Sequence, residues 1–177
     1  RQSKADLVLM WTTVPHSARI VGISKAMQFA PQFMSTSTTS DFPLMMKITK
    51  GIWEGVITAT LGVLPDADHP LLNKYKKEVF DKYAAKEERW GVFYYAGIIF
   101  TEPMIEGLKR AGRDLTRESF ITAMESIKGF RGIGPEVSYK PYNKNDMYSR
   151  QGGAETFLVQ CLAGGKYKKL TDWMSIK

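Results

Sequence analysis

The stretch GLKRAGRDLTRESFITAMESIKGF, residues 107–130, decides how the second half of this chain is interpreted. It predicts the end of one helix, capped by Gly112, and a second helix that begins after the capping residue Thr116. Apolar side chains recur at helical spacing along the second helix, at Phe120, Ile121, Met124 and Ile127. An irregular stretch, GPEVSYKP at 134–141, follows these two helices.

The sequence on either side of this stretch predicts one more helix and a hairpin. Upstream, residues 91–111 have a helical pattern, and Pro103 predicts a kink or break near Thr101. Downstream, TFLVQCLAGGKYKKLTDW at 156–173 contains two strand-like runs, 157–162 and 166–170. The small residues 163–165 between these runs predict a β-hairpin turn.

The first sixty residues predict a β-α-β pattern. The apolar run Leu7–Trp11 is typical of a strand that is covered on both faces in a parallel sheet. A helix is expected from Pro15 to just before Pro31, followed by strands at 32–34 and 55–60. Ligands usually bind at the loops that follow the carboxyl ends of such strands. Beyond them, a further helix is marked by apolar residues at Leu72, Tyr75, Val79 and Tyr83.

Four segments taken in order resemble one family. The stretches at 107–130, 134–141 and 156–173, together with ADLVLMW at 5–11 before Thr-Thr-Val-Pro, resemble the C-terminal half of the periplasmic solute-binding proteins of branched-chain amino acid type ABC transporters. The resemblance covers nearly all of this chain but only about half of a family member, so we expect a truncated product. It implies an α/β fold, the C-terminal half of a two-lobe type I periplasmic-binding-protein fold, with parallel sheets flanked by helices and a C-terminal β-hairpin.

The family topology implies a division of the chain between two lobes. Residues 1–60 would form part of the C-terminal lobe, and 61–135 part of the N-terminal lobe. Residues 136–148 would be a hinge crossing, and 149–177 would return to the C-terminal lobe. Both lobes would be incomplete, so we expect open sheet edges that a dimer or a partner chain could cover.

The resemblance also implies a function. The protein would be an extracytoplasmic substrate-binding protein that binds a small organic solute by lobe closure and delivers it to a membrane permease. Its location would be periplasmic or extracytoplasmic, with a signal peptide expected in the missing N-terminal half. A ligand-sensing receptor or regulatory domain on the same fold is the alternative.

The candidate site residues follow from aligning the first strand and Pro15 with the family. Thr13 matches the family position after the first strand, and Ser37 matches the position where an acidic residue commonly meets an ammonium group. The solute would be an amino acid or a neutral or acidic organic compound. Because Ser37 is not acidic, and because hydroxyls at Thr12 and Thr36 can donate to a carboxylate or carbonyl, we favour an organic acid or related compound over the amino acid. Asp41 could still supply the charge if its loop curls back.

Three further side chains have two interpretations each. Trp90 matches the family position that walls the apolar end of the cleft, and it could equally be packing at the start of a helix. Trp11 and His16 border the predicted ligand loop. Trp11 could instead be a core aromatic residue, and His16 a solvated residue in the first turn of the helix.

Composition excludes several other classes of protein. The net charge is +7, but the basic residues are scattered among acidic ones, which argues against a nucleic-acid partner. The single cysteine, Cys161, excludes an internal disulfide and is expected to be buried, and two histidines give no zinc spacing. We find no catalytic motif and therefore expect no enzyme, no cofactor and no metal. The apolar runs are too short to span a bilayer.

Overall fold

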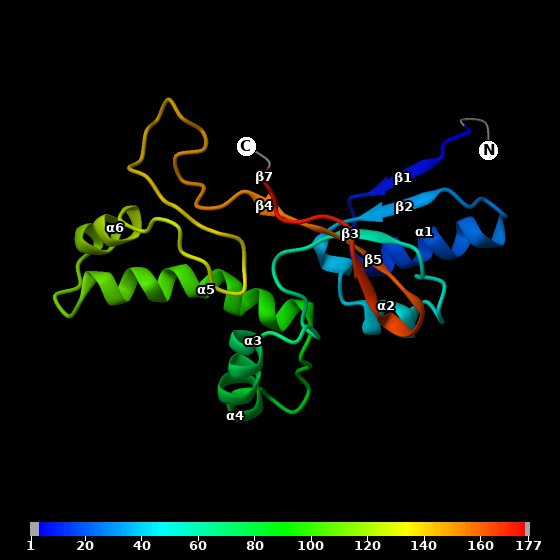
Figure 1. Cartoon of the computed structure of the whole chain (residues 1–177), viewed down its shortest axis with the longest axis horizontal. Helices are drawn as coiled ribbons and strands as arrows, with labels where there is room; N and C mark the ends of the chain where they lie inside the picture. The colour runs from blue at the N-terminus through cyan, green and yellow to red at the C-terminus, as the bar shows by residue number, and fades with distance from the viewer. Residues whose placement is uncertain (1–3, 176–177) are drawn as a thin grey trace. The chain divides into compact units, whose positions relative to one another are not determined.

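The computed structural model describes residues 4–175, which fall into two compact units (Figure 1). Among the described residues, 4–60 and 157–174 form the first unit, and 61–156 with residue 175 form the second. The division into lobes that was predicted from the sequence also has a boundary after residue 60. It ends the second segment at 135, whereas residues 136–156 lie in the second unit of the structure. The assignment of the units to lobes of the family stays a prediction.

The first unit is a mixed α/β layer structure. Its sheet strands are β1 (Leu7–Met10), β2 (Gln32–Ser35), β3 (Ile57–Ala59), β5 (Leu158–Cys161) and β6 (Tyr167–Lys169). Its helices are α1 (Val14–Ala26) and α2 (Phe42–Ile48), with short 3-10 turns at Ser37–Thr39 and Ala163–Gly165. The helix α2 was not anticipated, although Asp41 followed by Pro43 is a start signal for a helix.

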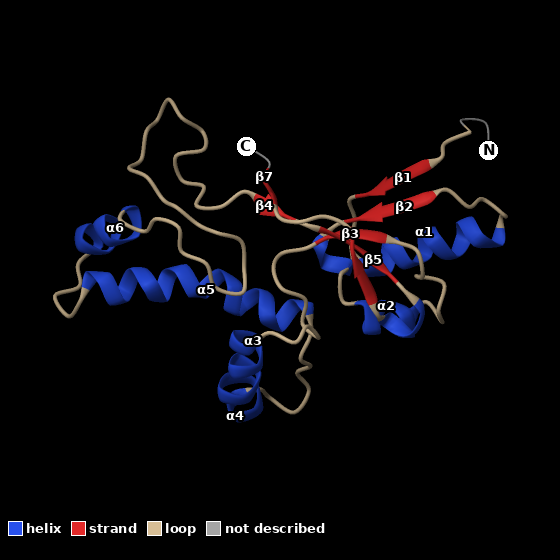
Figure 2. Ribbon diagram, viewed as in Figure 1, coloured by secondary structure: helices blue, strands red, loops and turns tan. Residues whose placement is uncertain are grey.

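The sheet has the strand order β1-β2-β3-β5-β6. The first three strands are parallel, and β5 and β6 are antiparallel to their neighbours, which confirms the C-terminal hairpin. One row of partners crosses the sheet and is buried, and it consists of Met10, Ser35, Thr58 and Val159. Figure 2 shows α1 and α2 on one side of this sheet, which explains the burial of that face.

The opposite face of β1 differs from the sequence prediction. Leu7 and Leu9 point to the other side of the pleat and are 48% and 68% exposed. The expectation that β1 is covered on both faces is therefore wrong for the described chain, because α1 and α2 lie on the same side of the sheet.

The second unit is mainly helical. It contains α3 (Pro70–Tyr75), a π-helical turn η2 (Lys76–Phe80), α4 (Asp81–Tyr83), α5 (Val92–Ala111) and α6 (Arg117–Glu125). Its core is a cluster of buried apolar side chains, namely Leu72, Val92, Tyr95, Ile99 and Ile133. Two short strands, β4 (Glu155–Thr156) and β7 (Met174–Ser175), lie where the chain passes from one unit to the other.

The helix ends follow the sequence signals. Gly112 terminates α5 with a φ of +76°, and Thr116 caps α6 in a capping box with Ser119. Pro103 does not break α5, which is continuous from 92 to 111. Tyr95 and Ile99 before the proline and Gly107 after it are buried in the same helix face, so packing holds both halves in one element.

Candidate functional site

The candidate site begins where β1 ends. Thr13 is the N-cap residue of α1, but its side chain makes no capping hydrogen bond, and its Oγ1 lies 2.7 Å from Nδ1 of His16. Pro15 stands in the first turn, where its missing N–H costs nothing. The first turn of α1 contains no acidic residue. The amino end of this helix therefore presents backbone N–H groups and a partial positive charge that no acidic side chain in that turn offsets.

The second part of the site begins where β2 ends. Residues after Ser35 form a 3-10 turn, in which Thr36 Oγ1 lies 2.9 Å from Thr38 Oγ1. Thr39 and Ser40 donate their hydroxyls to backbone oxygens of the same turn, at 2.9 and 2.7 Å. The turn is thus held by its own polar side chains and is a fixed platform for hydroxyl groups.

Strand register brings these two loops to the same edge of the sheet. Met10, the last residue of β1, pairs with Ser35, the last residue of the parallel strand β2. The loops at 11–13 and 36–37 therefore start from adjacent strand ends. Thr12, Thr36 and Ser37 are half-buried there, and Thr13 and His16 are exposed. Six of the seven predicted site residues are thus gathered at one edge.

Trp11 lies at this edge with 90% of its side chain exposed, so it is not a core aromatic residue. The exposed His16 ring accepts or donates a hydrogen bond with Thr13, depending on its tautomer. The interpretation of Trp11 as a core residue is therefore wrong, whereas His16 is an exposed residue in the first turn of α1. Trp11 is available as an exposed apolar surface, whereas His16 is a first-turn residue that positions the Thr13 hydroxyl.

Asp41 does not carry a free charge toward these loops. Its side chain is only 4% exposed, and its Oδ1 accepts a hydrogen bond of 3.1 Å from the backbone N of Leu44. The carboxylate therefore caps α2 at the end where negative charge is favoured. The hydroxyl residues of the two loops remain as the polar groups at the edge.

Trp90 belongs to the second unit and packs there. Its Nε1 donates a hydrogen bond of 2.8 Å to the carbonyl oxygen of Pro65. Its ring lies 5.5 Å from that of Phe80 and 6.0 Å from that of Tyr94, between ring centroids. Packing before the start of α5 accounts for these contacts, and a role in ligand binding stays a prediction.

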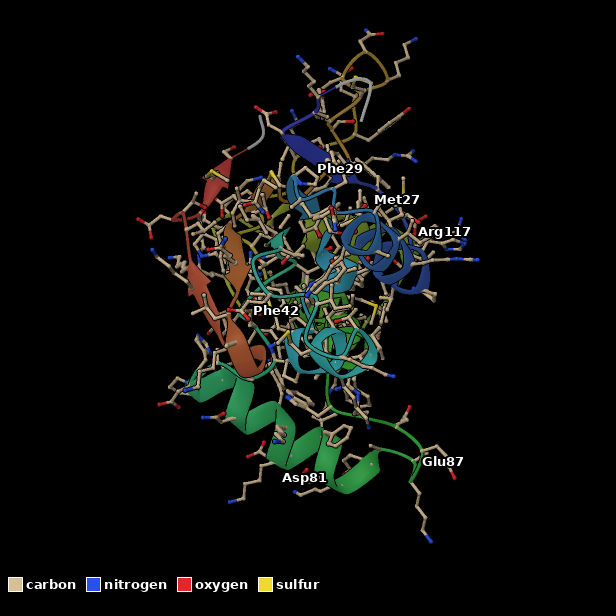
Figure 3. All side chains as sticks on the ribbon, turned by 90° about the vertical axis from the view of Figure 1, so that its right-hand side faces the viewer. Met27, Phe29, Phe42, Asp81, Glu87 and Arg117 are labelled. Atoms are coloured by element: carbon tan, nitrogen blue, oxygen red, sulfur yellow. The ribbon has the colours of Figure 1, made fainter. Side chains whose placement is uncertain are left out.

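Each unit also contains hollows of its own. In the first unit, a groove of about 510 Å³ follows the end of α1, near the labelled Met27 and Phe29 in Figure 3, and reaches the start of β2 at Gln32. This is the opposite end of β2 from the hydroxyl loops. In the second unit, a cavity of about 190 Å³ is lined by Tyr75, Glu102 and Lys109, among others.

The buried carboxylate of Glu102 was missed by the sequence interpretation. It is 5% exposed, and it accepts hydrogen bonds from the Tyr75 hydroxyl and from the backbone N of Ile133. An acidic residue three positions after Ile99 and seven after Tyr95, on the apolar stripe of α5, was the signal that could have revealed it. No group of three metal-ligating side chains occurs in residues 4–175, and no helix in that range is long and apolar enough to cross a membrane.

Comparisons with known proteins identify the family. The periplasmic binding protein family matches residues 1–166. A comparison with curated proteins found no match. Among solved structures, a branched-chain amino acid ABC transporter protein from Thermus thermophilus with bound valine has a TM-score of 0.81 at 19% identity, and the match covers 98% of this chain and 47% of that chain.

Two more solved structures are similar in fold. A possible leucine/isoleucine/valine-binding protein from Rhodopirellula baltica SH 1 has a TM-score of 0.77 at 17% identity, with 97% of this chain and 44% of that chain covered. A fatty acid ABC transporter substrate-binding protein from Thermomonospora curvata has a TM-score of 0.70 at 20% identity, with 98% and 44% covered. The chain spans less than half the length of these structures.

These matches confirm both the family and the fold class that the sequence predicted. The matched family is one of binding proteins rather than enzymes. At such low identity the solved structures show the shared α/β fold alone, and this chain corresponds to about half of it. The chain therefore belongs to the periplasmic binding protein family.

Proposed function

We propose that this chain is the C-terminal half of an extracytoplasmic substrate-binding protein of an ABC transporter. In this proposal the protein binds a small organic solute between two lobes and presents the closed form to a membrane permease. Family membership supports the solute-binding role, and two of the solved relatives are proteins of a branched-chain amino acid transporter and a fatty acid transporter. A signal peptide ahead of the lobes stays part of the proposal.

One observation carries the location of the site. Two adjacent parallel strands end together, at Met10 and Ser35, and each is followed by a loop rich in hydroxyl groups. The first of these loops also leads into the uncapped amino end of α1. Hydroxyls and backbone N–H groups together can donate to the oxygens of a bound solute.

The chemistry of these loops favours an acidic or carbonyl-containing solute. A carboxylate beside the amino end of α1 is stabilised by about 0.3–1 kcal/mol at an exposed position, and by more where it is partly buried. An ammonium group would need a carboxylate partner, and Asp41 is already engaged in capping α2. We therefore infer an organic acid or related carbonyl compound.

Open edges of the sheet support a covering partner. β1 pairs with β2 along one edge, and its exposed Leu7 and Leu9 add apolar surface. Such an edge favours pairing with another strand. In the complete protein a preceding segment would supply it, whereas the 177-residue chain by itself would use a second copy, which its mass in solution tests.

A thermal-shift experiment on the full-length protein tests the solute class. We expect small carboxylates to raise Tm and leucine to leave it unchanged, since a ligand at about 100 times its Kd stabilises by about 2.7 kcal/mol. Thr13→Val removes one donor and is expected to reduce the shift. Thr101→Val on α5, where the hydroxyl bonds only to its own helix, is the matched control. A leucine shift larger than any carboxylate shift contradicts the proposed class.

A further inference from the structure

The segment after α6 carries large apolar side chains into solvent. Met147 is 85% exposed, Tyr142 is 59% exposed and Tyr148 is 57% exposed. Figure 1 shows this part of the chain, between α6 and β4, as an irregular excursion that extends beyond α6. Exposed aromatic and methionine side chains on one loop form an apolar surface that is unusual for a purely solvated segment.

This exposed surface continues into a groove against α6. The groove has a volume of about 350 Å³. Its apolar lining comes from both sides, with Phe120, Ile121 and Met124 from α6 and Tyr139 and Tyr142 from the segment. Ile121 is itself 48% exposed. We call the segment 139–150 together with this lining the α6 groove surface.

Basic side chains border the α6 groove surface, and one carboxylate, that of Glu125, lines the groove beside them and accepts the backbone N–H of Tyr142. Lys140 forms an ion pair with Asp146. The other two basic residues of the segment are Lys144 and Arg150. The Arg150 guanidinium lies 4.2 Å from the centre of the Tyr142 ring. Within residues 4–175, no carboxylate forms an ion pair with Lys144 or Arg150. Two cations are therefore available beside exposed tyrosine and methionine.

We propose that the α6 groove surface binds anionic phospholipid at a membrane surface. Lysine and arginine attract the negative lipid headgroups, and tyrosine is favoured at the boundary between headgroups and acyl chains. The groove offers apolar walls to the upper part of an acyl chain. The net charge of +7 adds long-range attraction to an anionic membrane. Charge complementarity thus distinguishes a lipid surface from a purely apolar protein partner.

This inference does not depend on which solute the protein binds. Lipid binding by the α6 groove surface would hold the protein near the plane of a membrane. The candidate solute site at Thr13 and Ser37 lies in the other unit and shares no residue with this surface.

Vesicle co-sedimentation of the intact protein tests the inference. The vesicles contain phosphatidylcholine alone, or phosphatidylcholine mixed with phosphatidylglycerol. We expect binding to the anionic vesicles and little binding to phosphatidylcholine. Binding should weaken between about 0.1 M and about 1 M NaCl, since the Debye length falls from about 10 Å to about 3 Å.

Two double variants distinguish binding by the α6 groove surface from general attraction between the basic protein and anionic vesicles. Met147→Ser with Tyr148→Ser leaves the net charge unchanged and removes apolar surface, and Lys144→Glu with Arg150→Glu reverses two charges. We expect each pair to weaken binding by about tenfold or more. The α4 controls are Tyr83→Ser, where the residue is 78% exposed, and Lys82→Glu with Lys86→Glu, which reverses two exposed charges in and just after α4. We expect them to bind nearly as the parent does.

Three outcomes overturn the inference. The first is equal binding to neutral and anionic vesicles. The second is parental binding by the Met147→Ser, Tyr148→Ser pair, provided that circular dichroism shows it folded. The third is an equal loss of binding in the α4 controls, which indicates unspecific attraction to the whole basic surface. Solute-induced thermal shifts in the same variants report separately on the proposed function.

Discussion

The hydroxyl of Tyr75 on α3 donates a hydrogen bond of 2.9 Å to the buried carboxylate of Glu102 on α5. The same carboxylate accepts the backbone N–H of Ile133, at 2.9 Å to Oε2 and 3.2 Å to Oε1. Burial raises the pKa of Glu102 even though these hydrogen bonds oppose the shift. Burial, the hydrogen bond to Glu102 and the charge of Glu102 raise the pKa of Tyr75 to about 12.

The raised pKa of Glu102 predicts how stability depends on pH. The native protein holds this proton more tightly than the unfolded chain does, so protonation favours the fold. The stabilisation is present below the ordinary value of 4.5 and is lost as pH rises from there through the raised native pKa. Glu102→Gln removes the titrating group, and with it this loss of stability, while its amide oxygen still accepts hydrogen bonds. We expect urea denaturation to show a weaker fall of stability with rising pH in this variant.

The control for this prediction is Glu102→Ala. Alanine leaves the Tyr75 hydroxyl and the Ile133 N–H without their acceptor, which costs about 1–3 kcal/mol per buried group. This variant should therefore be less stable than Glu102→Gln at every pH. An identical pH dependence in the parent and in Glu102→Gln contradicts the assignment of the slope to this carboxylate.

Two glycines of the second unit should respond oppositely to alanine. A Cβ at Gly62 would lie 2.4 Å from the backbone oxygen of Ile133 and 2.7 Å from Cδ1 of Ile99. Because a backbone atom must move, we expect Gly62→Ala to cost about 1–3 kcal/mol. A Cβ at Gly97, exposed on α5, meets nothing within 4 Å, so Gly97→Ala should stabilise by up to about 1 kcal/mol. Thermal unfolding of both variants measures the difference, and a stable Gly62→Ala protein contradicts the close approach.

Cys161 should be unreactive in the native protein. Its side chain is fully buried, and burial, with the charge of Glu54, raises the pKa of the thiol to about 11. Only the thiolate attacks thiol reagents, so we expect labelling near pH 8 to be slow until urea is added. Because Cys161 is the sole cysteine, the signal needs no correction for other thiols. Complete labelling within seconds before denaturation contradicts the buried position.

Asp41 is expected to act on stability rather than on the ligand. Asp41→Ala removes the cap of α2 and should cost about 1 kcal/mol, whereas Asp41→Asn keeps a capping oxygen and should cost less. Denaturation curves of the two variants test this order. Solute binding by Asp41→Asn should match that of the parent. A loss of solute binding in this variant would indicate that the Asp41 carboxylate contacts the ligand.

Local signals in the sequence were sufficient for most elements of the fold. Thr116 and Gly112 set helix ends because capping depends on the nearest few residues. The persistence of α5 across Pro103 was not predictable, since it rests on core contacts of Ile99 with distant residues. The one-sided burial of β1 likewise depends on which face α1 and α2 cover, and an apolar run such as 7–11 does not contain that information.

The candidate site was predictable to the extent that it follows from strand order. The loops that contain Thr13 and Ser37 start at one edge of the sheet because β1 and β2 are adjacent and parallel, which a β-α-β pattern implies. The capping role of Asp41 was not foreseen, because the short helix α2 was missed. The contacts of Trp90 with Phe80 and Pro65 join residues 10 to 25 positions apart, and periodicity does not specify them.

Native mass spectrometry of the full-length protein as isolated from cells tests the central claim most directly. We expect a noncovalently retained small molecule with a carboxylate or carbonyl group, which is released on denaturation and is lost from a Thr13→Val, Ser37→Ala double variant. Retention of the same molecule by that variant, or a covalently modified protein in place of a complex, would contradict a solute site at the ends of β1 and β2.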